Sequence, residues 1–139
     1  MIFDRDRSHP IATSIEIPQA ILDIWIPRKN QIVMVEAIAL PIAAATFAEA
    51  LKDKMVLWMI DSDSVLGAMV KGYSDREDIC STAGIFWQQM REMGVDVYLD
   101  RIPTDGNLSD GPSRGFWATA MKAGWRIVPA VIPDELKMK

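Results

Sequence analysis

The stretch Met55-Val56-Leu57-Trp58-Met59-Ile60-Asp61 is the part of this sequence that decides the fold. Its six apolar residues place hydrophobic side chains on both faces of a strand, which is typical of a central strand in a covered parallel sheet. An acid follows directly, so Asp61 is expected at the carboxyl end of this strand, where open α/β sheets place their ligands. The stretch therefore predicts a central strand that ends in a candidate functional carboxylate.

Helical segments are predicted on both sides of this strand. Residues 31–51 are rich in alanine and predict one long helix, with a kink or a break at Pro41. After the strand, one helix is predicted over 62–70 and another over 76–93, because Gly72 and Gly94 follow them as terminating glycines. A second strand is predicted where apolar and polar residues alternate, from Val95 to Ile102.

The remaining segments predict shorter elements. Residues 11–17 alternate at the strand period, 18–25 favour a short helical turn, and 111–123 favour a helix that carries Trp117. The order of strands and helices predicts an α/β fold with a mixed central sheet flanked by helices. With 139 residues and no recognisable linker, the chain is expected to form a single domain over residues 1–139.

Composition narrows the functional class. Half of the residues are hydrophobic and 24% are charged, as in globular proteins. The formal net charge of −4 gives no broad basic field, which argues against a stand-alone nucleic-acid binder but leaves room for a local basic patch. The single cysteine, Cys80, excludes an internal disulfide framework. With a charged N-terminal segment and no long apolar run, we expect an intracellular protein, cytoplasmic or nuclear, without a membrane span.

Three carboxylates occur in contexts that suit a divalent cation. Glu36 interrupts an apolar helical stretch, Asp61 ends the strand, and Asp110 lies in a turn before the last predicted helix. Hard cations such as Mg²⁺ or Mn²⁺ prefer oxygen ligands. Each acid also has a simpler explanation, since Glu36 fits a solvent-facing stripe and Asp61, Asp63 or Asp110 fits an N-cap. Their joint occurrence is what predicts a metal site.

The stretch from Gln31 to Gly115 resembles the ribonuclease H-like domain of retroelement reverse transcriptase polyproteins. Its motifs are a helical Glu in Val35-Glu36-Ala37-Ile38-Ala39, an apolar strand ending in Ile60-Asp61-Ser62, and Arg101-Ile102-Pro103-Thr104 followed by Asn107-Leu108-Ser109-Asp110-Gly111-Pro112-Ser113-Arg114. The last is the most specific, because it is similar to the family signature R-V-P-S-x-x-N-x-A-D-x-x-S-R. Residues 116–139 are the part that the resemblance constrains least.

The resemblance implies a ribonuclease H-like fold and hydrolysis of the RNA strand of RNA–DNA hybrids with two Mg²⁺ ions. It implies that Glu36, Asp61 and Asp110 are catalytic residues and metal ligands. The residues that it implies for substrate binding are Ser62, Asn107, Ser113 and Arg114. It also implies an upstream reverse transcriptase domain in the parent polyprotein, and Lys71, Arg101 and Arg114 are candidates for contacts with backbone phosphates.

The sequence departs from the family pattern at its start. The family's first catalytic Asp lies on a first strand, whereas Ile2-Phe3-Asp4 resembles the end of the second strand. Asp4 and Asp6 lie in a charged turn and are poor replacements. The resemblance therefore implies either a fragment without the first strand or the loss of one metal ligand, and in both cases impaired hydrolysis.

Two other functional classes stay open. Asp61-Ser62-Asp63-Ser64-Val65-Leu66 matches D-x-D-x-T/V-L/V, the first motif of haloacid-dehalogenase-like phosphatases, with Asp61 as nucleophile and Asp63 as acid and base. Against it, sixty residues precede Asp61 and no acidic pair follows a later apolar strand. The other class is a ribonuclease H-like binding or structural module without catalysis, which the missing first Asp and the negative net charge favour.

Overall fold

A parallel pair of strands, β2 (Met55–Ile60) and β3 (Asp96–Arg101), organises the structure around the candidate site. The computed structural model describes residues 11–13, 16–25, 32–72, 74, 76–102 and 126–137. Met55 pairs with Asp96 and Ile60 with Arg101, so the carboxyl ends of both strands lie at the same edge. Both predicted strands are confirmed as strands, but the central position expected for β2 is not, because β2 pairs with β3 alone among the described strands.

Burial along β2 alternates, which differs from the predicted cover on both faces. Val56 and Trp58 are half-buried and Ile60 is buried on the face toward the helices, whereas Met55 and Leu57 are 77% and 66% exposed. The described elements thus cover one face of the β2–β3 pair. An apolar run shows that both faces of a strand tolerate burial, but the neighbouring elements decide which face is buried.

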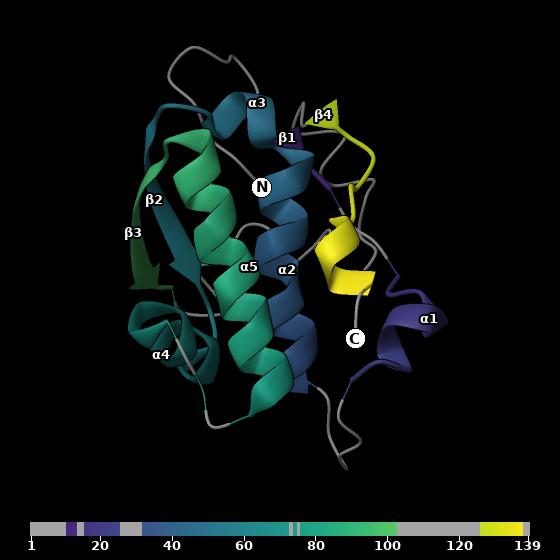
Figure 1. Cartoon of the computed structure of the whole chain (residues 1–139). Coiled ribbons are helices and arrows are strands. Elements are labelled where there is room, and N and C mark those ends of the chain that lie inside the picture. The colour runs from purple at the N-terminus through teal and green to yellow at the C-terminus, as the bar shows by residue number, and fades with distance from the viewer. Residues whose placement is uncertain are drawn as a thin grey trace.

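Two helices connect β2 to β3, α4 (Asp63–Lys71) and α5 (Glu77–Met93). They end as predicted at Gly72 and Gly94, whose φ angles of 77° and 67° lie in the left-handed region that glycine adopts without strain. Figure 1 shows α4 and α5 beside the strand pair. Parallel strands need a long crossover connection, usually helical, and α4 and α5 provide it between β2 and β3.

The predicted helix over 31–51 is two helices, α2 (Ile32–Thr46) and α3 (Ala48–Leu51). Of the kink or break predicted at Pro41, the break is wrong, because Pro41 lies inside α2 and the interruption falls at Phe47. Proline removes one intrahelical hydrogen bond. Pro41 is fully buried, and its carbonyl oxygen accepts a hydrogen bond from Gln89 Nε2 at 3.0 Å, so this turn of α2 packs against α5.

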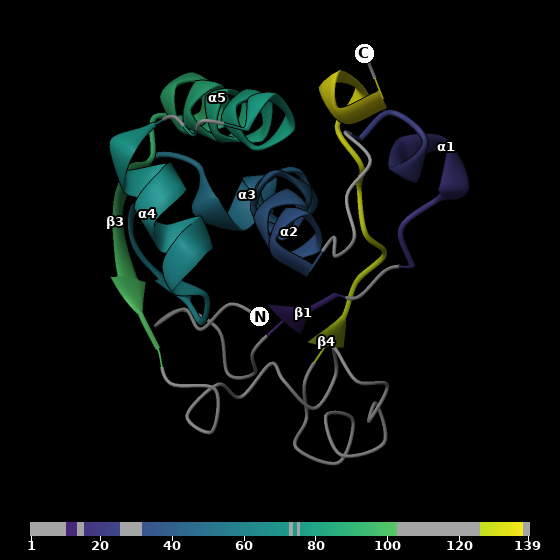
Figure 2. The same ribbon diagram turned by 90° about the horizontal axis from the view of Figure 1, so that it is seen from below.

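Helix α2 is buried on two sides, which explains why its sequence is apolar nearly all round. Figure 1 and Figure 2 show it between the β2–β3 pair and a layer formed by α1 (Gln19–Leu22) and η2 (Asp134–Lys137). Its first side packs in a cluster with strand and helix residues, namely Ala37, Leu40, Ala44, Ile60, Val65, Met69, Ala83, Phe86 and Met90. Its other side packs on the outer layer in a second cluster, namely Ile21, Trp25, Met34, Ile38, Ile42, Ile79 and Leu136.

A second, smaller strand pair joins β1 (Ile11–Ala12) to β4 (Arg126–Ile127), also in parallel. The described strands therefore form two separate parallel pairs, whereas one mixed sheet was expected. The α/β class is confirmed. The helix predicted over 111–123 lies outside the described residues. Within the described part of the chain, no helix is long and apolar enough to cross a membrane.

Candidate functional site

Asp61 lies where the sequence predicted it, directly after β2 at the carboxyl edge of the strand pair. The pairing continues up to this residue, because the Ile102 backbone N–H donates to the Ile60 carbonyl at 3.0 Å. The side chain of Asp61 is half-buried. The parallel register also brings Arg101 next to Ile60, so the end of β3 places a cation one residue away from Asp61 in the ladder.

The helix cap at this edge is made by Ser62. Its Oγ accepts a hydrogen bond from the Val65 backbone N–H at 3.3 Å, which satisfies one of the unpaired donors in the first turn of α4. The simpler explanation of Asp61 or Asp63 as the N-cap is therefore wrong. Ser62 was also predicted to bind substrate, and its hydroxyl still has a proton to donate while it caps.

Asp63 forms an ion pair with Arg101 across the edge. The distance from Arg101 Nε to Asp63 Oδ1 is 2.9 Å, and the pair links the first turn of α4 to the last residue of β3. Arg101 is 36% exposed and Asp63 is 87% exposed. In the phosphatase alternative, Asp63 would be the acid and base, and this ion pair would have to open before it could act.

Glu36 lies on α2 and is half-buried. Its neighbours Ala37 and Leu40 are buried in the same cluster as Ile60, the residue that precedes Asp61. The prediction that the helix carrying Glu36 packs on the strand with Asp61 is confirmed. Glu36 thus stands at the border between this packed face and solvent. Whether the carboxylates of Glu36 and Asp61 converge on one ion stays a prediction.

The other predicted site residues, Asp110, Asn107, Ser113 and Arg114, lie outside the described residues. Among the residues that the structure describes, no three His, Cys, Asp or Glu side chains are grouped so as to hold a metal ion. Glu36 and Asp61 have the oxygen chemistry that Mg²⁺ or Mn²⁺ prefers. They offer two carboxylates, so the described residues do not complete such a site by themselves.

A cavity of about 580 Å³ adjoins this edge. Its floor is one face of α4, where Ser64, Gly67, Ala68 and Lys71 follow each other at helical spacing, and Arg76 lines it from the start of α5. Within the described ranges, neither Lys71 nor Arg76 has an acidic partner. Sequence reasoning missed Arg76. The sequence feature that could have indicated the cavity is the pair of small residues Gly67 and Ala68, which lies between the polar Ser64 and Lys71 on one face of α4.

Comparisons of the chain with known protein families, curated proteins and solved structures found no match. The functional interpretation therefore depends on the residues and on the geometry at this edge.

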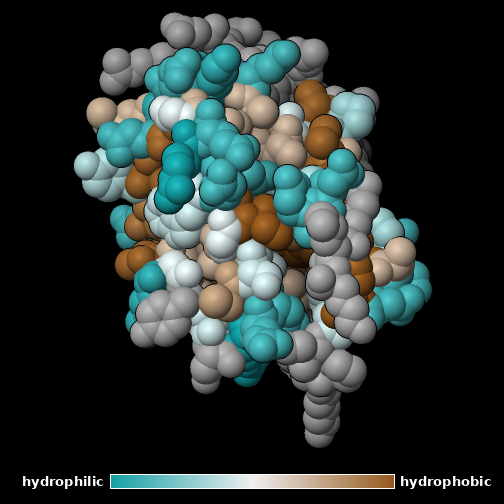
Figure 3. Space-filling view, in the orientation of Figure 1, coloured by the Kyte–Doolittle hydropathy of each residue, from teal (hydrophilic) through white to brown (hydrophobic). Residues whose placement is uncertain are grey.

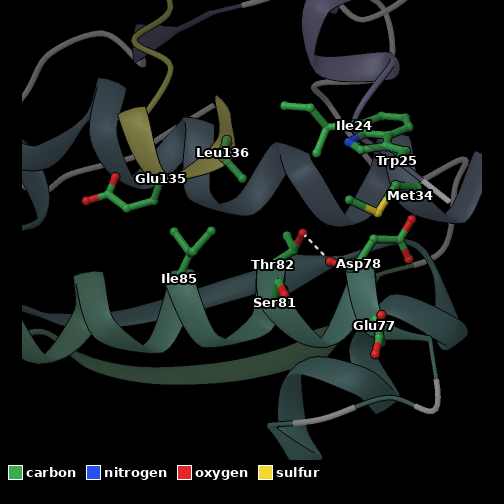
Figure 4. A pocket seen from close by; sticks show the side chains of 10 residues that line it. All are labelled: Ile24, Trp25, Met34, Glu77, Asp78, Ser81, Thr82, Ile85, Glu135 and Leu136. Atoms are coloured by element: carbon green, nitrogen blue, oxygen red, sulfur yellow. Dashed lines mark hydrogen bonds between the residues drawn. The ribbon is translucent and has the colours of Figure 1, made fainter. Parts of the chain in front are cut away.

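A second hollow, of about 240 Å³, is lined by residues of α5, α2 and η2 and by Ile24 and Trp25, which follow α1. Figure 4 shows Thr82 and Ile85 pointing from α5 toward Leu136, while the Thr82 hydroxyl donates to the Asp78 carbonyl at 2.8 Å. Figure 3 shows hydrophobic atoms gathered in a depression between α5 and η2. None of the predicted site residues lines this hollow, and Figure 1 shows α2 between η2 and the β2–β3 pair.

Proposed function

We propose that this chain is a ribonuclease H-type domain of a retroelement reverse transcriptase polyprotein, which hydrolyses the RNA strand of RNA–DNA hybrids. The observation that carries the proposal is the position of Asp61. It follows a strand whose parallel partner places Arg101 beside it, and Ser62 takes the capping role that would otherwise explain it. An acid at the carboxyl end of a parallel strand is a candidate for ligand chemistry.

The proposed roles follow from the elements that carry the residues. Asp61, directly after β2, and Glu36, on α2, would hold a divalent cation together with Asp110. A bound Mg²⁺ or Mn²⁺ supplies an activated water and compensates the charge of the leaving oxygen in phosphodiester hydrolysis. The protein's own contribution is to fix two carboxylates on rigid elements, because α2 and β2 share one packed cluster.

The ribonuclease H-like fold is part of the proposal. It is supported by a parallel strand pair whose connecting helices, α4 and α5, share a packed cluster with α2 and β2. In this proposal β2 and β3 are neighbours in a larger mixed sheet. The face of β2 that carries the exposed Met55 and Leu57 is then covered by other elements of the polyprotein. A structure with the hybrid bound tests this arrangement directly.

The activity test is a labelled RNA–DNA hybrid incubated with Mg²⁺ or Mn²⁺. Because three of the family's four acids are assigned, we expect very slow cleavage by this chain and faster cleavage when an N-terminal strand with a central Asp is added. Asp61→Asn should abolish cleavage, since it removes a ligand charge without changing shape. The matched control is Asp96→Asn, an exposed carboxylate at the opposite end of β3.

A metal titration gives an independent readout. Broadening of protein NMR signals by Mn²⁺ should centre on residues around Asp61 and Glu36, and Asp61→Asn or Glu36→Gln should remove it while Asp96→Asn keeps it. Broadening that is centred elsewhere would contradict the assignment of the metal site. Binding of the hybrid without any cleavage, even with the added strand, would favour the non-catalytic module.

A further inference from the structure

The side chain of Arg101 lies at the edge where a phosphodiester would approach Asp61. Arg101 is the last residue of β3 and pairs with Ile60, and the next backbone N–H, from Ile102, donates to the Ile60 carbonyl. These backbone contacts fix the Cα of Arg101 beside the strand end that carries Asp61. A cation fixed at this position is suited to contact a substrate that Asp61 also contacts.

Part of the guanidinium group is available for a ligand. Nε donates to Asp63 Oδ1 at 2.9 Å, and Nη1 donates to the Ile102 carbonyl. These are the side-chain hydrogen bonds that Arg101 makes within the described ranges of the chain. A guanidinium has five N–H donors, and the side chain is 36% exposed, so the remaining donors can reach a ligand from solvent.

The bond to Asp63 is of the kind that exchanges easily. Asp63 is 87% exposed, and ion pairs between solvent-exposed side chains contribute little to stability. A phosphate offers the guanidinium two parallel charge-assisted hydrogen bonds, which a single contact with one carboxylate oxygen does not. Asp63 also lines the cavity that holds Lys71 and Arg76, so the carboxylate stays among cations after Arg101 leaves it.

We propose that Arg101 is a phosphate-binding residue and that the Asp63 carboxylate occupies the position of the phosphate when nucleic acid is absent. When a hybrid binds, the guanidinium exchanges the Asp63 carboxylate for a backbone phosphate next to the one at Asp61. This inference rests on the proposed function and adds to it a residue that positions the substrate, together with the acid that competes for that residue.

The test measures binding of a short fluorescein-labelled RNA–DNA hybrid by anisotropy, in EDTA, over a series of salt concentrations. Arg101→Gln should weaken binding about tenfold, since it removes hydrogen bonds to a charged group. It should also reduce the slope of log affinity against log salt by roughly 0.7 to 0.9, the value for one lost phosphate contact. Arg101→Lys should keep the salt-dependence slope while weakening binding. Lysine keeps the positive charge but lacks the planar guanidinium that forms two parallel hydrogen bonds with a phosphate. Arg91→Gln is the matched control, an exposed arginine in the last turn of α5.

The decisive variant is Asp63→Asn. If the Asp63 carboxylate only competes with the phosphate for Arg101, removing that carboxylate should tighten binding by a few-fold. This gain should be much smaller in an Arg101→Gln background. If Asp63 instead builds a rigid scaffold for Arg101, the same change should weaken binding, which would overturn the inference. An unchanged salt slope for Arg101→Gln would overturn it as well.

The outcomes for the two proposals are distinguishable. Wild-type protein that binds the hybrid with no dependence on Arg101 contradicts this inference alone. Binding that depends on Arg101 in a chain that never cleaves contradicts the hydrolytic function and leaves the phosphate contact standing. Wild-type protein that does not bind the hybrid at low salt contradicts both.

Discussion

The same substitution at two glycines of α5 should change stability in opposite directions. Gly84 lies exposed within the helix, and a Cβ built there meets nothing within 4 Å. Gly84→Ala should therefore stabilise the fold by about 0.8 to 1 kcal/mol, the helix propensity difference between the two residues. Gly94 ends the helix at φ 67°, where an L-residue pays roughly 1 to 2 kcal/mol. Its added Cβ would also stand 2.7 Å from Asp53 Oδ1.

The two variants should thus differ by about 2 to 3 kcal/mol. For a chain of this length, 1 kcal/mol corresponds to about 3 °C in the melting temperature, so a separation of about 6 to 9 °C is expected. Thermal unfolding followed by circular dichroism, with urea unfolding as a second measurement, gives both values. Stabilisation by Gly94→Ala would refute the position of the α5 end and with it the start of β3. Destabilisation by Gly84→Ala would refute the exposed helical position of Gly84. Asp53 has a φ of 59°, so Asp53→Ala is itself expected to be destabilising. Measured within an Asp53→Ala background, the Gly94→Ala loss should be smaller, because the oxygen that the new Cβ meets is absent.

Two further substitutions test the core and the helix cap. Phe86→Ala should destabilise the fold by about 3 to 5 kcal/mol in urea unfolding, because Phe86 is fully buried with its ring centroid 5.1 Å from that of Trp58 and 5.3 Å from that of Trp87. A loss below about 1 kcal/mol would place it outside the core. Ser62→Ala should lose about 1 kcal/mol with the cap, whereas Ser81→Ala, at an exposed helix position, should have little effect; equal values for the two serines would remove the capping role.

Elements with a local signal could be predicted from the sequence. The two strands that carry the site follow from an apolar run and an alternating run. The ends of α4 and α5 follow from Gly72 and Gly94, because few residues other than glycine adopt the left-handed conformation there. These features depend on a few neighbouring residues, so no knowledge of tertiary packing is needed.

Features that depend on tertiary contacts were not predicted correctly. The helix continues through Pro41, which is fully buried and contacts Gln89 of α5, far along the chain. The exposure of Met55 and Leu57 depends on which elements lie over the strand pair, and the run of apolar residues does not contain that information.

The candidate site shows the same division. Asp61 at the strand end was predicted from local sequence, whereas the N-cap role considered for Asp61 or Asp63 belongs to Ser62. The ion pair between Asp63 and Arg101 depends on the register of two strands separated by two helices. A local sequence pattern therefore does not predict this ion pair. Arg76 at the cavity was missed for the same reason, since the connection between α4 and α5 brings it there.

The apolar sequence of β2, whose Met55 and Leu57 stay exposed in the fold, has a consequence for aggregation of the unfolded chain. Met55-Val56-Leu57-Trp58-Met59-Ile60 has no charge, no proline and strong β-propensity, the composition of segments that stack into intermolecular cross-β assemblies. Lys52, Asp53 and Lys54 stand before it, and Asp61 and Asp63 stand after it, so charges flank the segment at both ends. Such flanking charges act as gatekeepers against self-association. The carboxylate assigned to the site would then also keep the chain soluble during refolding, and neutralising Asp61 would increase aggregation at high protein concentration independently of any effect on catalysis.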